Sequence, residues 1–228
     1  EGGKQLGFED PRGQLFLEYI RIVNLKKPKF FVIENVQGIL EDKHKQSLTF
    51  IIESLRSIGY SISYQLLNAG DFRIPQDRLR VFFVGIRNDL QSTFDFPNSM
   101  PGKKVTLREA IGDIIEKPRF FTTEMVMSEH PTRKNHDVYT GSYDAKYMAR
   151  NRVRTWNEQS FTIQAQARNE PQHPQAPKMT YVSPNVRIFA KGYEHLYRRL
   201  SVRECARIQT FPDSFVFIYY LPVAKGDR

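Results

Sequence analysis

The sequence predicts an α/β protein with a larger region of helices and strands and a smaller, mostly irregular or β region. Helical and strand-like hydrophobic patterns alternate through residues 1–117, whereas from Pro118 onward proline, asparagine, glutamine and tyrosine accumulate and long helical periodicity disappears. A helical pattern returns after Ser201. We therefore predict a first domain over 1–117, a second over 118–196, and a return segment over 197–228 that rejoins the first domain.

The composition excludes several classes of protein. The chain has 228 residues, of which 40% are hydrophobic and 26% charged, too apolar for disorder and too long for a disulfide-stapled peptide. No apolar run reaches the roughly 20 residues of a membrane helix, and the first residues form no secretory signal, so we expect a cytoplasmic protein. With one cysteine, Cys205, and five scattered histidines, we expect neither a disulfide nor a metal site.

The positive charge is concentrated in the middle and late part of the chain. The whole chain carries a net charge of +9, and residues 118–200 carry 13 basic and 7 acidic side chains, a net charge of +6. Such a segment is either a solvated surface or a binding surface for a polyanion. The charge alone does not decide between the two.

The first domain is predicted to begin as helix, strand and helix. Apolar residues at helical spacing indicate a helix around 15–23, and the unbroken apolar run 30–33 is typical of a parallel strand buried on both faces. A second amphipathic pattern predicts a helix over 44–58 that ends at Gly59. Two further strands are predicted around 62–66 and 81–86.

Two capping-box patterns predict short helices. Thr106 followed by Glu109 predicts a helix over 107–115, and Ser201 followed by Glu204 predicts another near the end of the chain. Between them the sequence indicates only short strands and loops.

Polar residues directly follow the predicted strand 30–33. The triplet Glu34-Asn35-Val36 lies at the carboxyl end of that strand, which is where open α/β sheets bind ligands. Glu34 is therefore a candidate site residue. A single acidic residue after a strand is also compatible with a simple loop cap, and position alone does not decide.

Two arginines enter a later strand. In Gln76-Asp77-Arg78-Leu79-Arg80 the arginines are two positions apart, so in an extended backbone both side chains would point to one face. They would bind an anion or a base edge, or else pair with a carboxylate such as Asp77 or Asp71.

An arginine-rich segment, 150–168, interleaves arginines and amides with aromatic residues. Arginine to guanine and glutamine or asparagine to adenine are the common two-bond base contacts, and arginine also binds phosphate. The alternative is an exposed strand with Trp156 packed in the core. The DNA-binding candidates are Arg152, Arg154, Gln164 and Arg168.

Four motifs, in this order, resemble the DNA cytosine-5 methyltransferases, most closely the HaeIII-type bacterial modification methylases. They match the patterns D-x-R-G-x-L-F, E-N-V, Q-x-R-x-R and R-x-L-(S/T)-x-R-E-x-A-R-x-Q-x-F-P. In this chain they are Asp10–Phe16, Glu34–Val36, Gln76–Arg80 and Arg198–Pro212.

The resemblance implies a partial Rossmann-like methyltransferase domain that uses S-adenosylmethionine, joined to a target-recognition domain over 118–196. A cytosine swung out of double-stranded DNA would be methylated at C5. Glu34 would bond cytosine N3 and N4, Arg80 would hold O2, and Arg78 would support the catalytic loop. The expected site is a short GC-rich palindrome such as GGCC, and the protein is expected to associate with the nucleoid.

Two family motifs are absent from the 228 residues. The glycine-rich F-x-G-x-G segment of the methyl-donor site and the nucleophilic Pro-Cys pair do not occur, so no cofactor-binding residue is assigned. Cys205 lies on the apolar side of a predicted helix and is expected to pack rather than react. We therefore expect a truncated methyltransferase that is inactive alone.

Three interpretations stay open at this point. The chain is a part of an enzyme that works within an intact protein or with a complementary fragment, as in a split methylase. Alternatively it is a non-catalytic DNA-binding fragment. A basic α/β scaffold that binds no DNA would leave the order of the four motifs unexplained.

Overall fold

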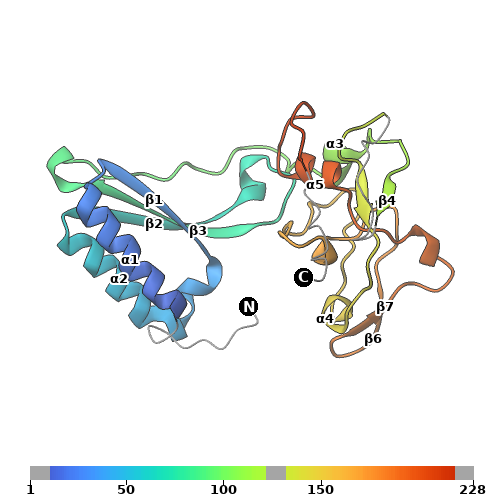
Figure 1. Cartoon of the computed structure of the whole chain (residues 1–228), viewed down its shortest axis with the longest axis horizontal. Coiled ribbons are helices and arrows are strands. Elements are labelled where there is room, and N and C mark those ends of the chain that lie inside the picture. The colour runs from blue at the N-terminus through green and yellow to red at the C-terminus, as the bar shows by residue number, and fades with distance from the viewer. Residues whose placement is uncertain (1–10, 122–131, 219–228) are drawn as a thin grey trace, which may run out of the picture. The chain divides into compact units, whose positions relative to one another are not determined.

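The computed structural model describes residues 11–121 and 132–218, and it divides the chain into two compact units. Unit 1 contains residues up to Asn68 together with Leu79–Ser99, and unit 2 contains Ala69–Arg78 together with the residues from Met100 onward. Each unit is described by itself below (Figure 1).

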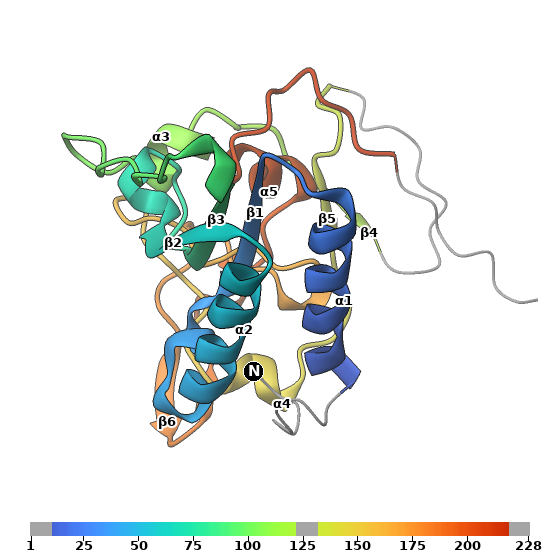
Figure 2. The same ribbon diagram turned by 90° about the vertical axis from the view of Figure 1, so that its left-hand side faces the viewer.

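Unit 1 is a three-stranded sheet with two helices on one face. The helices are α1 (Pro11–Lys26) and α2 (Lys45–Ser57), and the strands are β1 (Phe30–Val36), β2 (Tyr60–Asn68) and β3 (Leu79–Arg87). Figures 1 and 2 show α1 and α2 running side by side over the sheet. The predicted helix 44–58 is therefore confirmed within one residue at each end. Gly59 ends it with φ of 94°, a left-handed conformation that glycine adopts without strain.

The core of unit 1 lies between the helices and the sheet. Phe31 and Tyr60 of the sheet pack against Val23 of α1 and Leu55 of α2. Their burial follows the alternation of side chains along a strand, because Phe31 and its alternate neighbours point to the helices. A glycine on β3, Gly85, lies opposite Phe31, and a Cβ atom there would overlap the phenyl ring.

The prediction of a parallel strand buried on both faces is wrong for the described residues. The sheet order is β1-β3-β2, and β3 pairs with both neighbours in the antiparallel direction. Along β1 burial alternates, so that Phe30 is 65% and Val32 54% exposed. The physical reason is that α1 and α2 both pack on the other face of the sheet.

Unit 2 consists of short elements connected by long loops. They are α3 (Leu107–Ile111), β4 (Arg119–Phe121), β5 (Asp137–Tyr139), α4 (Ala145–Met148), β6 (Thr180–Ser183), β7 (Val186–Ile188) and α5 (Val202–Ile208). The strands form two two-stranded sheets, parallel β4-β5 and antiparallel β6-β7. This agrees with the short strands and loops expected from Pro118 onward.

Both predicted capping boxes are present in unit 2. Thr106 begins α3 with Glu109 bonded back to it, and Ser201 begins α5 with Glu204 bonded back. The helix α3 is shorter than the predicted 107–115, because Gly112 ends it. Leu107 and Ile111 of α3 pack with Leu200, Ile163 and Ile208 in one buried cluster. Residues 100–117 therefore lie in unit 2, although the sequence placed them in the first domain.

Short 3-10 helices complete the fold. They are Gln37–Leu40, Asp42–His44, Ala69–Phe72, Asn88–Leu90, Ala167–Asn169 and Glu194–Leu196. Of the helices in residues 11–121 and 132–218, none is long and apolar enough to cross a membrane.

Candidate functional site

Glu34 and Arg80 meet in unit 1. Arg80 Nε lies 2.6 Å from Glu34 Oε1, and the two side chains are 20% and 45% exposed respectively. Glu34 stands near the end of β1 and Arg80 near the start of β3, and the antiparallel pairing places these two ends beside each other. The structure thus brings together two residues that are 46 positions apart in sequence.

The sheet register places this pair on the face that α1 and α2 leave uncovered. Glu34 pairs with Phe82 and Arg80 with Val36, so all four side chains belong to one face, whereas Phe31 and Val81 belong to the helix face. Arg80 is oriented further by its own strand, because Nη1 donates to the carbonyl of Leu79 at 2.8 Å. The sequence placed Glu34 after the strand, whereas it lies within β1.

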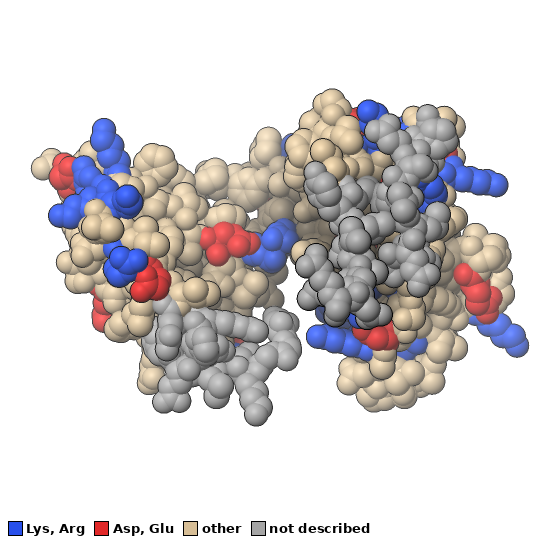
Figure 3. Space-filling model, viewed as in Figure 1, with Lys and Arg blue, Asp and Glu red and all other residues tan. Residues whose placement is uncertain are grey.

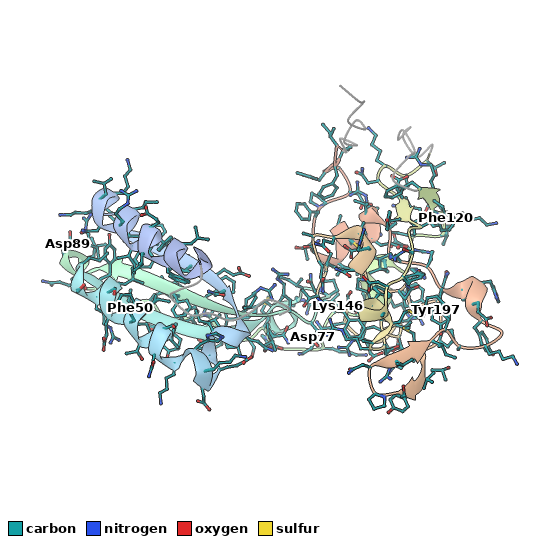
Figure 4. All side chains as sticks on the ribbon, turned by 60° about the horizontal axis from the view of Figure 1, so that its bottom comes forward. Phe50, Asp77, Asp89, Phe120, Lys146 and Tyr197 are labelled. Atoms are coloured by element: carbon teal, nitrogen blue, oxygen red, sulfur yellow. The ribbon has the colours of Figure 1, made fainter. Side chains whose placement is uncertain are left out.

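A different ion pair marks the other end of β3. Arg87 Nε lies 2.7 Å from Asp89 Oδ1. Figure 4 shows Asp89 at the edge of unit 1, and it also labels Phe50 of α2 in the same unit. This pair is local, because its members are two residues apart. Its hydrogen bonds lower the pKa of Asp89 below its ordinary value.

The first half of the Q-x-R-x-R motif belongs to unit 2 and binds the arginine-rich segment 150–168. Gln76 is 2% exposed, and its Oε1 accepts from the amide of Ile163 at 3.1 Å. The amide of Asp77 donates to the carbonyl of Ser160 at 2.8 Å. Arg78 lies just before β3, and its carbonyl accepts from the amide of Ala69. Arg78 lies in unit 2 and Arg80 in unit 1, so a common face for the two side chains stays a prediction.

Two of the four DNA-binding candidates, Arg152 and Arg154, bind other residues of unit 2. Arg152 is 9% exposed, and its Nε donates to the carbonyl of Tyr147 at 2.9 Å while its guanidinium lies 4.5 Å from that tyrosine's ring centre. Burial lowers the pKa of Arg152 below its ordinary value. Arg154 pairs with Asp77 at 3.2 Å and with Glu158 at 3.3 Å. Asp77, which sequence reasoning considered as a carboxylate partner of Arg78 or Arg80, thus binds Arg154.

The other two candidates, Gln164 and Arg168, are exposed. Gln164 lines a cavity of about 450 Å³ whose wall also contains Glu170 and Cys205. Burial raises the pKa of Glu170 to about 7, although a hydrogen bond from Cys205 Sγ at 3.3 Å and the charge of Arg199 lower it. Cys205 itself is buried, and burial raises the pKa of its thiol well above the ordinary value. A protonated, buried thiol is a poor nucleophile.

The described lysine and arginine side chains form no single continuous patch on the face shown in Figure 3. On the face shown in Figure 3, blue atoms occur at separate points among the coloured residues, several of them beside carboxylates. Throughout the described ranges, no three histidine, cysteine or acidic side chains are placed to hold a metal ion.

The start of α5 is fixed by buried charges that sequence reasoning did not select. Arg198 donates two 2.8 Å hydrogen bonds to the carboxylate of Glu204, which is fully buried. Burial alone would raise the pKa of Glu204, but these bonds lower it to about 2. His136 is also buried and contacts Ser201 Oγ at 2.9 Å. The repeated arginines around a capping box were the available signal for this cluster.

Comparison with known proteins identifies the class to which this fold belongs. The structure resembles that of Entamoeba histolytica methyltransferase EhMeth with a TM-score of 0.54 at 14% identity, covering 96% of this chain and 62% of that one. At this identity the likeness shows the fold, which is that of an α/β methyltransferase.

The family model for C-5 cytosine-specific DNA methylase matches residues 1–224, and the chain belongs to that family. It is 49% identical to the type II methyltransferase M.MthTI of Methanothermobacter thermautotrophicus over 98% of its own length and 67% of that protein's. It is 43% identical to M.FnuDI of Fusobacterium nucleatum over 99% of its length and 66% of that protein's. The chain thus spans about two thirds of the relatives that it matches.

Proposed function

We propose that this chain supplies the cytosine-holding and DNA-reading parts of a DNA cytosine-5 methyltransferase of the restriction-modification type. The observation that carries the proposal is the ion pair of Glu34 and Arg80, 2.6 Å apart at adjoining strand ends on the face opposite α1 and α2. The type II methyltransferases among the relatives support it.

One edge of cytosine is complementary to a hydrogen-bond acceptor that lies beside a hydrogen-bond donor. On the pyrimidine ring, O2 and N3 are neighbouring atoms, and the amino group on C4 follows N3. A carboxylate at the Glu34 position accepts hydrogen bonds from N4 and from a protonated N3, and a guanidinium at the Arg80 position donates to O2. Both interactions strengthen when a nucleophile attacks C6, because negative charge then develops on O2 and N3.

A cytosine reaches these groups only outside the duplex. Stacked in B-DNA, it cannot present C5 and C6 to an enzyme, so the base must rotate into a pocket. Glu34 and Arg80 belong to regular strands, which hold binding groups more precisely than loops do.

The family implies S-adenosylmethionine as the methyl donor. The F-x-G-x-G segment of the family's donor site and its Pro-Cys nucleophile do not occur in these 228 residues. No residue of this chain is therefore assigned to the donor.

For reading DNA we assign direct contacts to the exposed Gln164 and Arg168. The buried Arg152 would hold the arginine-rich segment 150–168 in place, since its side chain donates to the backbone carbonyls of Lys146 and Tyr147. Arg154 would contact DNA only by leaving Asp77 and Glu158. The target that we propose, from the resemblance, is a short GC-rich palindrome such as GGCC.

The experiment is bisulfite sequencing of DNA from cells that express the complete gene containing this chain, with Glu34→Gln as the comparison. We expect methylcytosine at one short site with the wild-type gene and none with the variant. Full methylation by the Glu34→Gln gene, or its absence in both cultures, would contradict the proposal. Purified alone, the 228-residue chain is expected to transfer no labelled methyl group to DNA.

A second candidate is a DNA-binding part without catalysis. It requires only the exposed Gln164 and Arg168 and gives Glu34 and Arg80 no role. It predicts binding of a specific duplex by the chain together with unmodified cytosine in cells that express the complete gene, so the same sequencing distinguishes the two functions.

A further inference from the structure

Arg199 is a buried cation in the middle of unit 2. It is 1% exposed, and within residues 11–121 and 132–218 no carboxylate lies at ion-pair distance from it. Four backbone carbonyls meet its charge instead. They belong to Tyr139, Gly141, Ser142 and Arg168, at donor–acceptor distances of 3.1, 2.8, 3.0 and 3.3 Å.

Three tyrosines surround the same guanidinium. The ring centre of Tyr143 lies 4.0 Å from its central carbon, and those of Tyr139 and Tyr147 lie at 5.3 and 5.5 Å. Two of these hydroxyls, on Tyr143 and Tyr147, accept hydrogen bonds from the amide of Gln172 at 3.0 Å. The planar fork of arginine suits this setting, because it donates in its plane and stacks on its faces.

A buried charge without a carboxylate is costly for stability alone. Well-packed apolar side chains of similar volume usually stabilise such a position as well or better. What the guanidinium provides is geometry, because its five N–H donors have fixed directions. Through these hydrogen bonds the guanidinium fixes the distance between residues 139–142 and residue 168.

The segment that ends at residue 168 carries the proposed DNA contacts. The backbone carbonyl of Arg168 accepts a hydrogen bond from Arg199, and the Arg168 side chain is exposed. Gln164 and Gln166, which precede it, also have exposed side chains. Arg152 contacts one of the same tyrosines, because its Nε donates to the carbonyl of Tyr147.

We propose that Arg199 is a positioning residue that sets the orientation of residues 164–168 toward the edges of DNA bases and so determines target specificity. It touches no DNA itself. The proposal rests on the proposed function, because it presumes that these residues read DNA.

The test is Arg199→Lys in the complete protein that contains this chain. Lysine keeps the charge but donates in fewer directions and does not stack as a plane. Affinities are measured by fluorescence anisotropy at one salt concentration. One duplex contains the target sequence that the complete protein methylates, and in the other duplex that sequence is scrambled. We expect target affinity to fall about tenfold, the size of one lost two-bond base contact, and scrambled affinity to stay within about twofold.

The matched control is Arg187→Lys, which removes another arginine stacked on a tyrosine, 4.9 Å from the ring centre of Tyr181 on the β6-β7 sheet. It should leave the ratio of affinities unchanged. If Arg199→Lys fails to fold, Tyr143→Leu removes the nearest ring from a partly exposed position and must lower the same ratio.

The outcomes separate the two proposals. An unchanged ratio in a folded Arg199→Lys or Tyr143→Leu protein, or equal losses on both duplexes, overturns the positioning role and leaves the proposed function intact. A wild-type protein that prefers no duplex overturns the proposed function and this inference with it.

Discussion

Glu34 and Arg80 are joined diagonally across β1 and β3. Glu34 pairs in register with Phe82 and Arg80 with Val36, yet the carboxylate and the guanidinium meet at 2.6 Å. Partly exposed ion pairs of this kind contribute about 0–1 kcal/mol to stability. Such a small contribution to stability is compatible with the proposed role of the pair in holding a ligand that needs an acceptor beside a donor.

In the complete protein that contains this chain, Glu34→Gln should slow methyl transfer far more than it weakens DNA binding. The neutral amide removes the carboxylate that favours protonation of cytosine N3, and such assistance contributes about 10²–10⁴-fold to a rate. Single-turnover kinetics and anisotropy on the same protein measure the two effects. Glu53→Gln, an exposed position on α2, is the control and should alter neither. A rate unchanged by Glu34→Gln would remove Glu34 from the mechanism.

Arg168→Ala should weaken target binding more than Arg154→Ala does. Arg168 is exposed, whereas Arg154 already contacts Asp77 and Glu158. If Arg168 reads a base, its loss costs about 1–3 kcal/mol on the target and little on random duplex. Equal losses on both duplexes would make Arg168 a phosphate contact, and a larger effect of Arg154→Ala would contradict the assignment.

Gly85→Ala should destabilise unit 1. The added Cβ would lie 2.2 Å from Phe31 Cζ, inside a packed core, and overpacking of this kind costs about 1–3 kcal/mol. The free energy of unfolding is measured with urea. Gly38→Ala is the matched control, since its Cβ would meet only Glu41 Oε1 at 3.5 Å. Equal stability of the two variants would show that the Phe31 ring moves aside at no cost.

Glu170 should make stability fall as the pH rises. Burial raises its pKa to about 7 in the folded chain, so the folded state keeps a proton that the unfolded state loses above its ordinary pKa. The stabilisation is fully present below the unfolded pKa of about 4.3 and is lost as the pH rises through the folded value. Relative to Glu170→Gln, the wild-type chain should lose about 2 kcal/mol between about pH 5 and pH 8.

His173 acts in the opposite direction and has to be separated from this effect. Burial lowers its pKa to about 4, so its contribution is present above the unfolded pKa and is lost as the pH falls through the folded value. Because His173 is present in both proteins, the difference between wild type and Glu170→Gln removes its contribution. A difference that does not change with pH would show that Glu170 is ionised in the folded chain.

Local patterns predicted the elements of this fold well. Helix α2, its glycine end and both capping boxes depend on residues within one or two turns, and their side-chain spacing was sufficient evidence. The direction and exposure of β1 were predicted incorrectly. A short apolar run does not reveal which strand will pair with it or which face the helices will cover.

The sequence by itself determined the family motifs, the main helices and the candidates Glu34 and Arg80. Only the tertiary structure decided that these two side chains meet, that Arg152 is buried, and that Arg199 is surrounded by carbonyls and tyrosines. The physical reason is that helix spacing and caps act between near neighbours in the chain. Strand pairing and the burial of a charge, by contrast, depend on groups that only the folded chain brings together.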